Sequence, residues 1–129
     1  MGSIFTKIIS GEIPSYKIEE NDKFLAFLDV NPIAKGHALV IPKKEIDYIF
    51  EIGTDLYSEF WLFAKEVAAK LEKEVECKRI GIAVVGLEVP HAHIHLVPID
   101  SVADINFSKP KLKFSEREMK ELAEKIRNS

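Results

Sequence analysis

Apolar residues recur with two different periods along this chain, and the changes of period divide it into helices and strands. Between residues 54 and 75 they return every three or four positions, which predicts the longest helix, with Thr54 as its N-cap. Trp61 and Leu62 fall outside the main stripe, so a second face of this helix is partly apolar and is a candidate contact with another subunit. The stripe itself consists of Leu56, Phe60, Phe63, Ala64, Val67 and Leu71.

Two shorter helices are expected near the ends of the chain. Residues 3–12, "SIFTKIISGE", place Ile4, Phe5 and Ile8 on one side, and Gly11 is a typical C-terminal stop. Near the other end, Ser115 and Glu118 have the spacing of a capping box. The helix that follows has a shared apolar face made of Met119, Leu122, Ala123 and Ile126.

The strands are predicted from short apolar or alternating runs bounded by turn residues. A hairpin is expected from residues 16–19 and 23–30, followed by the turn "NPIAKG" and a buried strand over 37–42. Two more strands are expected over residues 79–86, "RIGIAVVG", and 91–99, "HAHIHLVPI". This order of elements predicts an α+β domain whose sheet is mostly antiparallel.

Composition limits the classes of function. The chain has 129 residues, which predicts a single domain over 1–129, with a core at about 3–100 and a C-terminal extension at about 101–129. A net charge of −3 and a pI near 5.8 argue against a broad nucleic-acid surface. The basic stretch 108–114, "SKPKLKF", is interpreted as a solvated loop rather than a binding patch.

The expected location is the cytoplasm. Cys77 is the only cysteine, so no disulfide can form within the chain, and the N-terminus lacks an uninterrupted signal-peptide core. No apolar run approaches the roughly 20 residues that span a bilayer, so no membrane partner is expected.

Three of the four histidines stand at alternate positions in "PHAHIHLVP". Side chains of a strand alternate between its faces, so His91, His93 and His95 are expected to point the same way, about 6–7 Å apart. Two positive charges at that distance repel by about 2.5 kcal/mol at an effective dielectric constant near 20, so the three rings should not all be protonated near neutral pH and their titration should be coupled. This suits a relay of neutral and singly charged imidazoles better than a fixed cationic patch. The residues expected to point into the core instead are Ala92, Ile94 and Leu96.

These histidines suit two kinds of chemistry. Alternating histidines on a strand can hold a metal ion, with Glu88 or the fourth histidine, His37, as a further ligand. They can also supply a nucleophilic imidazole whose neighbours position a phosphoryl group. The residue pattern by itself leaves both alternatives open.

The sequence resembles the histidine triad (HIT) superfamily in three separate blocks. "HAHIHLV" matches its pattern of three histidines alternating with apolar residues, and "KGHALVIPKKEIDYI" resembles the strand that carries a fourth histidine. "IFTKIISGEIPSYKIEENDKFLAFLDVNP" is similar to the start of the Hint-like branch, which contains nucleoside phosphoramidases and nucleotide hydrolases. The resemblance covers roughly the first hundred residues and disfavours the metal-binding alternative.

The resemblance implies a fold and a mechanism. The implied fold is a five-stranded antiparallel sheet with a long central helix, forming a homodimer in which two sheets join. The implied reaction cleaves a purine nucleotide such as a nucleoside 5′-phosphoramidate or an AMP anhydride through a covalent nucleotidyl-histidine, without a cofactor. His93 takes the position of the nucleophile and His95 that of a phosphate contact, while His91 and His37 orient His93.

The resemblance also assigns substrate contacts. Asp29 matches the acidic residue that binds the ribose hydroxyls. Each apolar residue that matches the base-binding positions is equally well explained by core packing; these residues are Ile4, Phe5, Ile8, Phe27 and Val30.

Two departures from the Hint-like pattern concern the segment before the triad. Leu87 replaces a glutamine, and Glu88 stands where a hydroxyl residue often assists the leaving group. The Cys-x-x-Cys of some zinc-binding relatives is absent, so no zinc is expected. A catalytically weak nucleotide-binding module is the alternative to an enzyme.

Overall fold

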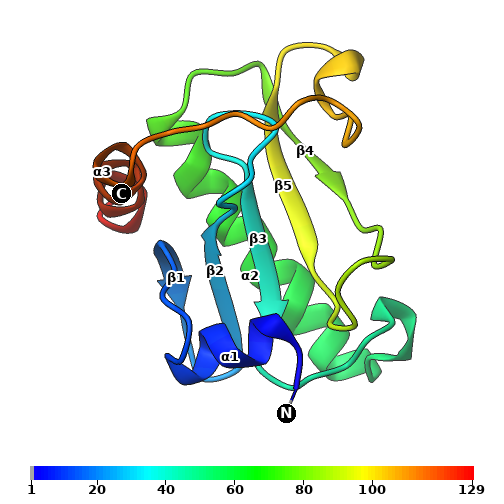
Figure 1. Ribbon diagram of the computed structural model, residues 1–129. Coiled ribbons are helices and arrows are strands. Elements are labelled where there is room, and N and C mark those ends of the chain that lie inside the picture. The colour runs from blue at the N-terminus through cyan, green and yellow to red at the C-terminus, as the bar shows by residue number, and fades with distance from the viewer. Residues whose placement is uncertain (1) are drawn as a thin grey trace.

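The computed structural model describes residues 2–129, which form a five-stranded sheet with helices on both faces (Figure 1). The strands lie in the order β1-β2-β3-β5-β4, and all neighbours are antiparallel. This confirms the expected α+β fold. The helices are α1 (Ile4–Ser10), α2 (Thr54–Glu74) and α3 (Glu116–Arg127). The strands are β1 (Lys17–Glu20), β2 (Phe24–Leu28), β3 (Ala38–Pro42), β4 (Arg79–Ala83) and β5 (Ile94–Ile99).

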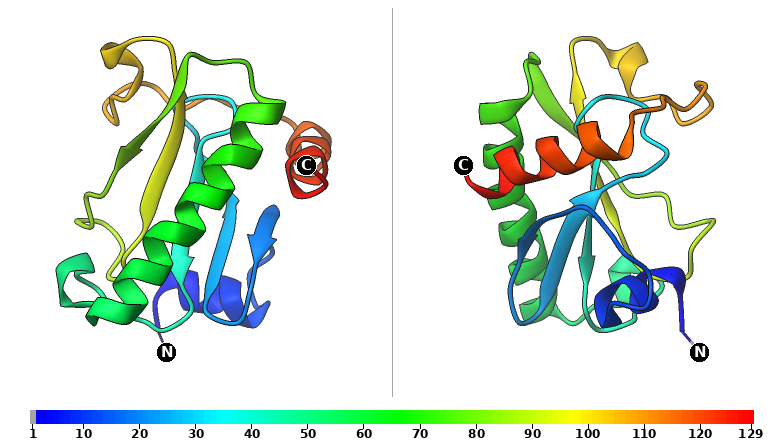
Figure 2. Two further views of the ribbon diagram at one scale, coloured as in Figure 1. Left: turned by 180° about the vertical axis from the view of Figure 1, so that it is seen from behind. Right: turned by 60° about the vertical axis from the view of Figure 1, so that its left-hand side comes forward.

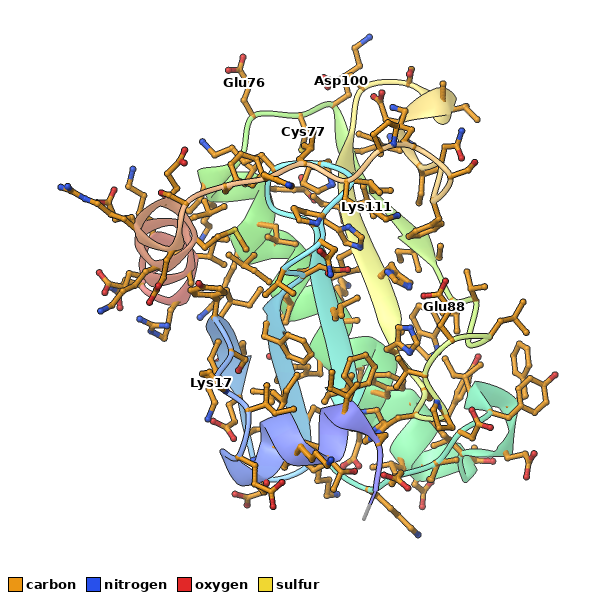
Figure 3. The ribbon with its side chains drawn as sticks, in the orientation of Figure 1. Lys17, Glu76, Cys77, Glu88, Asp100 and Lys111 are labelled. Carbon is orange, nitrogen blue, oxygen red and sulfur yellow. The ribbon has the colours of Figure 1, made fainter. Side chains whose placement is uncertain are left out.

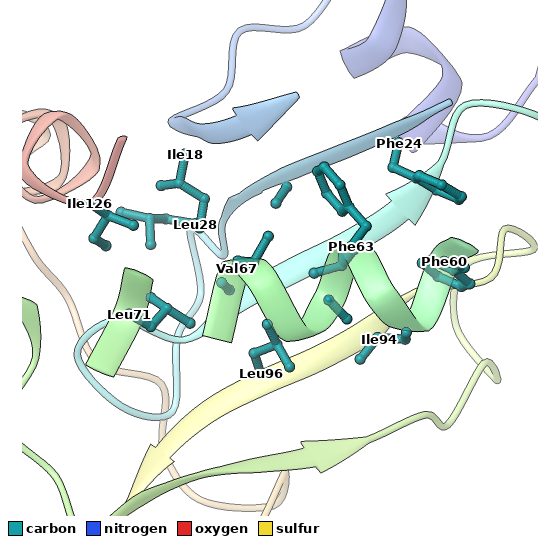
Figure 4. Close-up of a cluster of buried hydrophobic side chains, with 14 of the residues drawn as sticks. Ile18, Phe24, Leu28, Phe60, Phe63, Val67, Leu71, Ile94, Leu96 and Ile126 are labelled. Atoms are coloured by element: carbon teal, nitrogen blue, oxygen red, sulfur yellow. The ribbon is translucent and has the colours of Figure 1, made fainter. Parts of the chain in front are cut away.

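The larger part of the core lies between the sheet and α2 (Figures 2 and 4). The buried residues of α2 are those of the predicted stripe except Leu56, which is half-buried. Phe24 of β2 stacks on Phe60 of α2 with ring centroids 5.5 Å apart. Helix α3 closes this layer at the β1 side, where Ile126 is completely buried. Its predicted capping box between Ser115 and Glu118 is present.

The opposite face of the sheet is partly covered by α1. The smaller apolar cluster there combines α1 with the alternate residues of β2 and β3: Phe5, Ile8, Leu25, Phe27, Leu39 and Ile41. Ser3 caps the N-terminus of α1 by accepting a hydrogen bond from the Thr6 N–H. Gly11 ends the helix with φ = 88°, as predicted, because a residue without Cβ adopts this conformation without strain.

Some predicted boundaries are wrong. Gly53, not Thr54, is the N-cap of α2, and no side chain caps this helix. The strand expected from residue 79 to 86 ends at Ala83. The strand expected from His91 begins only at Ile94, because the Ala92 N–H donates to the carbonyl of Ile46, outside the sheet.

The loop between β2 and β3 has a fixed conformation. The Asp29 N–H donates to the His37 carbonyl, which closes the loop at its base. Gly36 has φ = 88°, and a Cβ at this position would come within 2.8 Å of Cγ2 of Val75. Glycine is therefore required one residue before His37, and the loop holds Asp29 and His37 side by side. Within residues 2–129, no helix is both long and apolar enough to cross a membrane.

Candidate active site

The four histidines gather on the α1 side of the sheet, in a row along the neighbouring strands β3 and β5. His37 directly precedes β3, and His95 of β5 pairs with Leu39 of β3. The rings of His93 and His95 have centroids 4.9 Å apart, and those of His37 and His95 are 5.2 Å apart. This side of the sheet faces the viewer in Figure 3. The predicted gathering of the histidines on one side is therefore present, although His91 and His93 lie outside the regular strand.

His93 is held with one nitrogen free for chemistry. Its Nδ1 lies 2.8 Å from the backbone carbonyl of His91, and a carbonyl can only accept, so Nδ1 carries the proton. In the neutral ring Nε2 then bears the lone pair. The edge of Phe5 packs against this imidazole at a centroid distance of 5.0 Å, which fixes the orientation of the ring. His93 thus has the tautomer that a nucleophile needs.

His37 and His95 form a second fixed pair. The Ile33 N–H donates to Nδ1 of His37 at 3.1 Å, so the proton of His37 is on Nε2. Nε2 of His37 lies 3.0 Å from Nδ1 of His95 and donates to it. The proton of His95 is consequently on its own Nε2, where it can be donated to a substrate oxygen. The loop between β2 and β3 therefore sets the tautomer of His95 through two hydrogen bonds in series.

His91 links the histidines to α1. Its Nε2 donates to the carbonyl of Pro42 at 2.7 Å, so its Nδ1 accepts from the hydroxyl of Ser3 at 2.8 Å. The same Ser3 oxygen caps α1 by accepting from Thr6, and the Ser3 N–H donates to Glu45 at 2.6 Å. His91 is completely buried and offers no free nitrogen, and its backbone carbonyl is the group that contacts Nδ1 of His93.

Burial keeps most of these rings neutral. Burial lowers the pKa of His37, against the opposing effect of Asp29, and burial likewise lowers the pKa of His91. Burial together with the neighbouring His93, His37 and Lys111 lowers the pKa of His95 to about 3. At neutral pH, His37, His91 and His95 are therefore uncharged, chiefly because they are buried, which agrees with the expectation that the row is not fully protonated.

One group of side chains has the composition of a metal site. Oxygen or nitrogen atoms of Asp29, His37 and His95 lie within 4.8 Å of one another. The nitrogen of His37 on that side is the protonated Nε2, and the ring cannot change tautomer because Nδ1 accepts from Ile33. A metal ligand needs a lone pair at that nitrogen, so this donor set does not fit a metal ion. Glu88, the other ligand considered, is not part of this group.

Asp29 lies at the end of β2 beside His37. Its Oδ2 is 3.7 Å from Nε2 of His37, while its Oδ1 accepts from the Asn31 N–H at 2.9 Å. The carboxylate is partly exposed, with a side-chain exposure of 20%. One oxygen thus fixes the turn, and the other is open to a ligand next to the histidines.

The five apolar residues assigned to base binding fall into two groups. Phe5, Ile8 and Phe27 are buried in the smaller core cluster, and the rings of Phe5 and Phe27 pack edge to face at 5.8 Å. Ile4 and Val30 are 49% and 63% exposed. The buried group therefore packs the α1 face, and the exposed pair is accessible to a ligand.

Glu88 and Leu87 lie on the segment between β4 and β5, and both are exposed (Figure 3). Sequence reasoning missed two other features: Ser3, whose only signal is its position as an N-cap, and Phe107 from the C-terminal extension. The Phe107 ring packs on His95 at a centroid distance of 4.6 Å and on His37 at 6.0 Å. The basic segment that follows Phe107 therefore begins directly over the site.

Comparison with known proteins agrees with this geometry. The family model of the HIT domain matches residues 10–102. An uncharacterized HIT-like protein of Helicobacter pylori is 43% identical over 101 residues, which cover 76% of this chain and 97% of that protein. The adenosine 5′-monophosphoramidase HNT1 of Saccharomyces cerevisiae is 38% identical over 100 residues, covering 74% of this chain and 61% of that enzyme.

The fold is shared with solved structures as well. The crystal structure of a HIT-like protein from Bartonella henselae superposes with a TM-score of 0.84 at 28% identity, covering 98% of this chain and 94% of that one. The matched family model spans most of the chain and includes all four histidines. The chain therefore belongs to the HIT family.

Proposed function

We propose that this protein hydrolyses nucleoside 5′-phosphoramidates or related AMP anhydrides through a covalent nucleotidyl-histidine at His93. The observation that carries the proposal is that two neighbouring rings, with centroids 4.9 Å apart, have complementary tautomers: Nε2 of His93 bears a lone pair, and Nε2 of His95 bears a proton. Membership of a superfamily of nucleotide-binding hydrolases supports it, as does similarity to the yeast adenosine 5′-monophosphoramidase.

The first step displaces the leaving group. Nε2 of His93 attacks the α-phosphorus, an N–P bond forms, and the bond from phosphorus to the leaving nitrogen or oxygen breaks; the leaving atom keeps the electron pair and takes up one proton from solvent. The attacking ring becomes cationic, and the hydrogen bond from its Nδ1 to the His91 carbonyl stabilises that charge. His95 donates from Nε2 to a phosphate oxygen, where negative charge concentrates.

The second step restores the enzyme. Water attacks the same phosphorus and gives up one proton to solvent, the N–P bond breaks with its electron pair returning to Nε2 of His93, and AMP is released. A neutral nucleophile suits both steps because it approaches an anionic phosphate without repulsion and is displaced as a neutral ring.

The remaining contacts follow from the site. Oδ2 of Asp29 accepts from the ribose hydroxyls, and the exposed Ile4 and Val30 line the base together with the buried aromatic pair behind them. Glu88, exposed on the segment before the triad, faces the leaving group and favours amines over long anionic groups by charge repulsion. The substrate is a purine nucleotide, and no metal takes part.

Replacement of His93 by Ala tests the proposal. The variant should release no AMP from an AMP-amide substrate, while its unfolding transition stays close to that of the wild type. Mass spectrometry of acid-sensitive adducts, trapped by rapid quenching at alkaline pH, should show AMP on His93 of the wild type. A wild type that binds AMP but never turns over would instead support a nucleotide-binding module, and an adduct on another histidine would contradict the assignment of His93.

The proposed assembly is a homodimer. Strand β4 is an edge strand of the sheet, and its Ile82 is 52% exposed, while Leu62 on the second face of α2 is 61% exposed. A second copy that pairs its β4 with this edge would cover both residues. Ile82→Glu should shift the sedimentation of the protein from dimer to monomer. A wild type that sediments as a monomer would contradict the dimer.

A further inference from the structure

The C-terminal extension does not leave the site after the triad. Residues 106–114 cross the top of the sheet from β5 toward α3, on the side where the histidines lie (Figures 1 and 3). The Leu112 N–H donates to the carbonyl of Pro32 at 2.8 Å, within the loop that carries Asp29 and His37. The crossing segment, as we call residues 106–114, is thus fastened to the same loop that sets the histidine tautomers.

Phe107 and Lys111 of the crossing segment are arranged together. The Phe107 ring rests on His95 and His37, and Nζ of Lys111 donates to the Phe107 carbonyl at 2.9 Å and lies 6.0 Å from the centre of its ring. Figure 3 shows Lys111 over the upper part of β3 and β5. Phe107 therefore holds the ammonium group of Lys111 next to the site.

Lys111 has no acidic partner of its own. None of the salt bridges found within residues 2–129 includes it, whereas Lys109, on the same segment, lies 3.5 Å from Asp104. Its charge nevertheless reaches the site, since it lowers the pKa of both His37 and His95. An unpaired cation beside a group of neutral rings is a binding element for an anion.

Among residues 2–129, Lys111 is the only lysine or arginine whose charge affects the pKa of His37, His91 or His95. His37, His91 and His95 are neutral at pH 7 because burial lowers their pKa values, and Asp29 adds a negative charge beside them. Phosphoryl transfer develops negative charge on the non-bridging oxygens, which catalysis must stabilise. Hydrogen bonds from neutral imidazoles supply only part of this stabilisation.

We infer that the crossing segment completes the substrate site, with Lys111 binding a phosphate oxygen of the nucleotide while Phe107 holds this lysine over His95. The inference rests on the proposed function, because it requires a 5′-nucleotide in the site. It defines the ligand more narrowly: the protein recognises the phosphate of the nucleotide by charge as well as by the histidines, so it discriminates nucleotides from nucleosides through Lys111.

The test compares AMP with adenosine as calorimetric titrants of the full-length protein. Lys111→Met keeps the aliphatic stem and removes the charge, so AMP affinity should fall by about tenfold or more, as expected for a charge-assisted hydrogen bond, and adenosine affinity should change less than about twofold. Lys111→Arg should restore most of the AMP affinity. The matched control is Lys113→Met, which removes the same charge from an exposed residue of the crossing segment and should leave the ratio of affinities unchanged.

The outcomes separate this inference from the proposed function. Equal losses for AMP and adenosine in Lys111→Met would give the lysine a merely structural role, and unchanged affinities for both titrants would place its charge in solvent; either result overturns the inference. If the wild type releases AMP from AMP-amide in the same experiments, the proposed function stands regardless. If the wild type binds neither titrant and releases no AMP, both are wrong.

Discussion

The two faces of the sheet are built from the same strands and have opposite characters. On the α2 face, Ile94 and Leu96 of β5 are completely buried in a continuous apolar cluster. On the α1 face, His95 lies between them in sequence and contacts His37 and His93. A shift of one residue thus separates packing from chemistry, because alternate side chains of a strand point to opposite faces.

The difference shows how polar groups are tolerated in a small domain. The fully buried side chains of the α2 cluster are apolar and need no hydrogen bonds, although Nε1 of Trp61, packed against this cluster, is buried without a partner among residues 2–129. On the α1 face His37 and His91 are almost completely buried, and each ring nitrogen of both has a partner. The buried His37 and His91 are therefore stabilised by complete hydrogen bonding of their rings, and the apolar face is stabilised by close packing.

Substitutions of two neighbouring residues of β5, one on each face of the sheet, should separate the loss of stability from the loss of activity. Leu96→Ala removes a completely buried side chain and should lower the free energy of unfolding by about 2–5 kcal/mol, while the folded fraction keeps its activity. His95→Gln should leave the free energy of unfolding within about 1 kcal/mol of the wild-type value and abolish most of the turnover. Urea unfolding and AMP release measure the two effects. A large stability loss in His95→Gln alone would contradict the separation.

The next largest effect is expected at Asp29, whose carboxylate lies beside the histidines on the α1 face. Asp29→Ala should weaken the binding of AMP by about 2–4 kcal/mol, because two charge-assisted hydrogen bonds to the ribose are lost. The variant should also no longer discriminate against 2′-deoxy-AMP. Asp29→Asn keeps an acceptor for the Asn31 N–H, so it tests the loss of the negative charge without the loss of the hydrogen bond that fixes the turn. Asp22→Ala, in the exposed turn between β1 and β2, is the control. Unchanged discrimination in Asp29→Ala would show that the ribose lies elsewhere.

Much of the fold could be predicted from the sequence because periodicity reports burial directly. The stripe of α2, the stop at Gly11 and the capping box of α3 are local signals, and all three are present. The start of β5 was predicted too early because it depends on a distant contact, the hydrogen bond from Ala92 to Ile46. The cap of α2 was also misassigned, since Thr54 and Gly53 are adjacent and both are acceptable N-caps.

The candidate site was predictable only as far as its residue types are rare. Three of the four histidines stand at alternate positions in the sequence, which is an unusual pattern, and all four lie close together in the structure. Ser3 and Phe107 are common residue types. Ser3 matters because it contacts His91, 88 positions away in the sequence, and Phe107 matters because the crossing segment brings its ring onto His95. No spacing in the sequence encodes such contacts, so they require the fold.

The smallest effect concerns acid sensitivity, which should originate on the histidine face. The unfolded chain binds a proton at His95 near pH 6.5, whereas in the folded protein burial lowers the pKa of His95 to about 3. Between pH 6.5 and 3 the unfolded state therefore holds more protons, so the free energy of unfolding should decrease as the pH falls through this range. The slope is at most about 1.4 kcal/mol per pH unit for each histidine that stays neutral in the folded state. Carboxylates with lowered pKa values, such as Glu20, add to the slope only below about pH 5.5, where unfolded carboxyl groups begin to take up protons, so urea unfolding between pH 6.5 and 5.5 isolates the histidines.

In that window His95→Gln should reduce the slope by up to about one proton, while Leu96→Ala should lower stability equally at each pH and leave the slope unchanged. An identical slope in wild type and His95→Gln would mean that His95 takes up its proton in the folded protein, and the neutral phosphate contact would then have to be replaced by a cationic one.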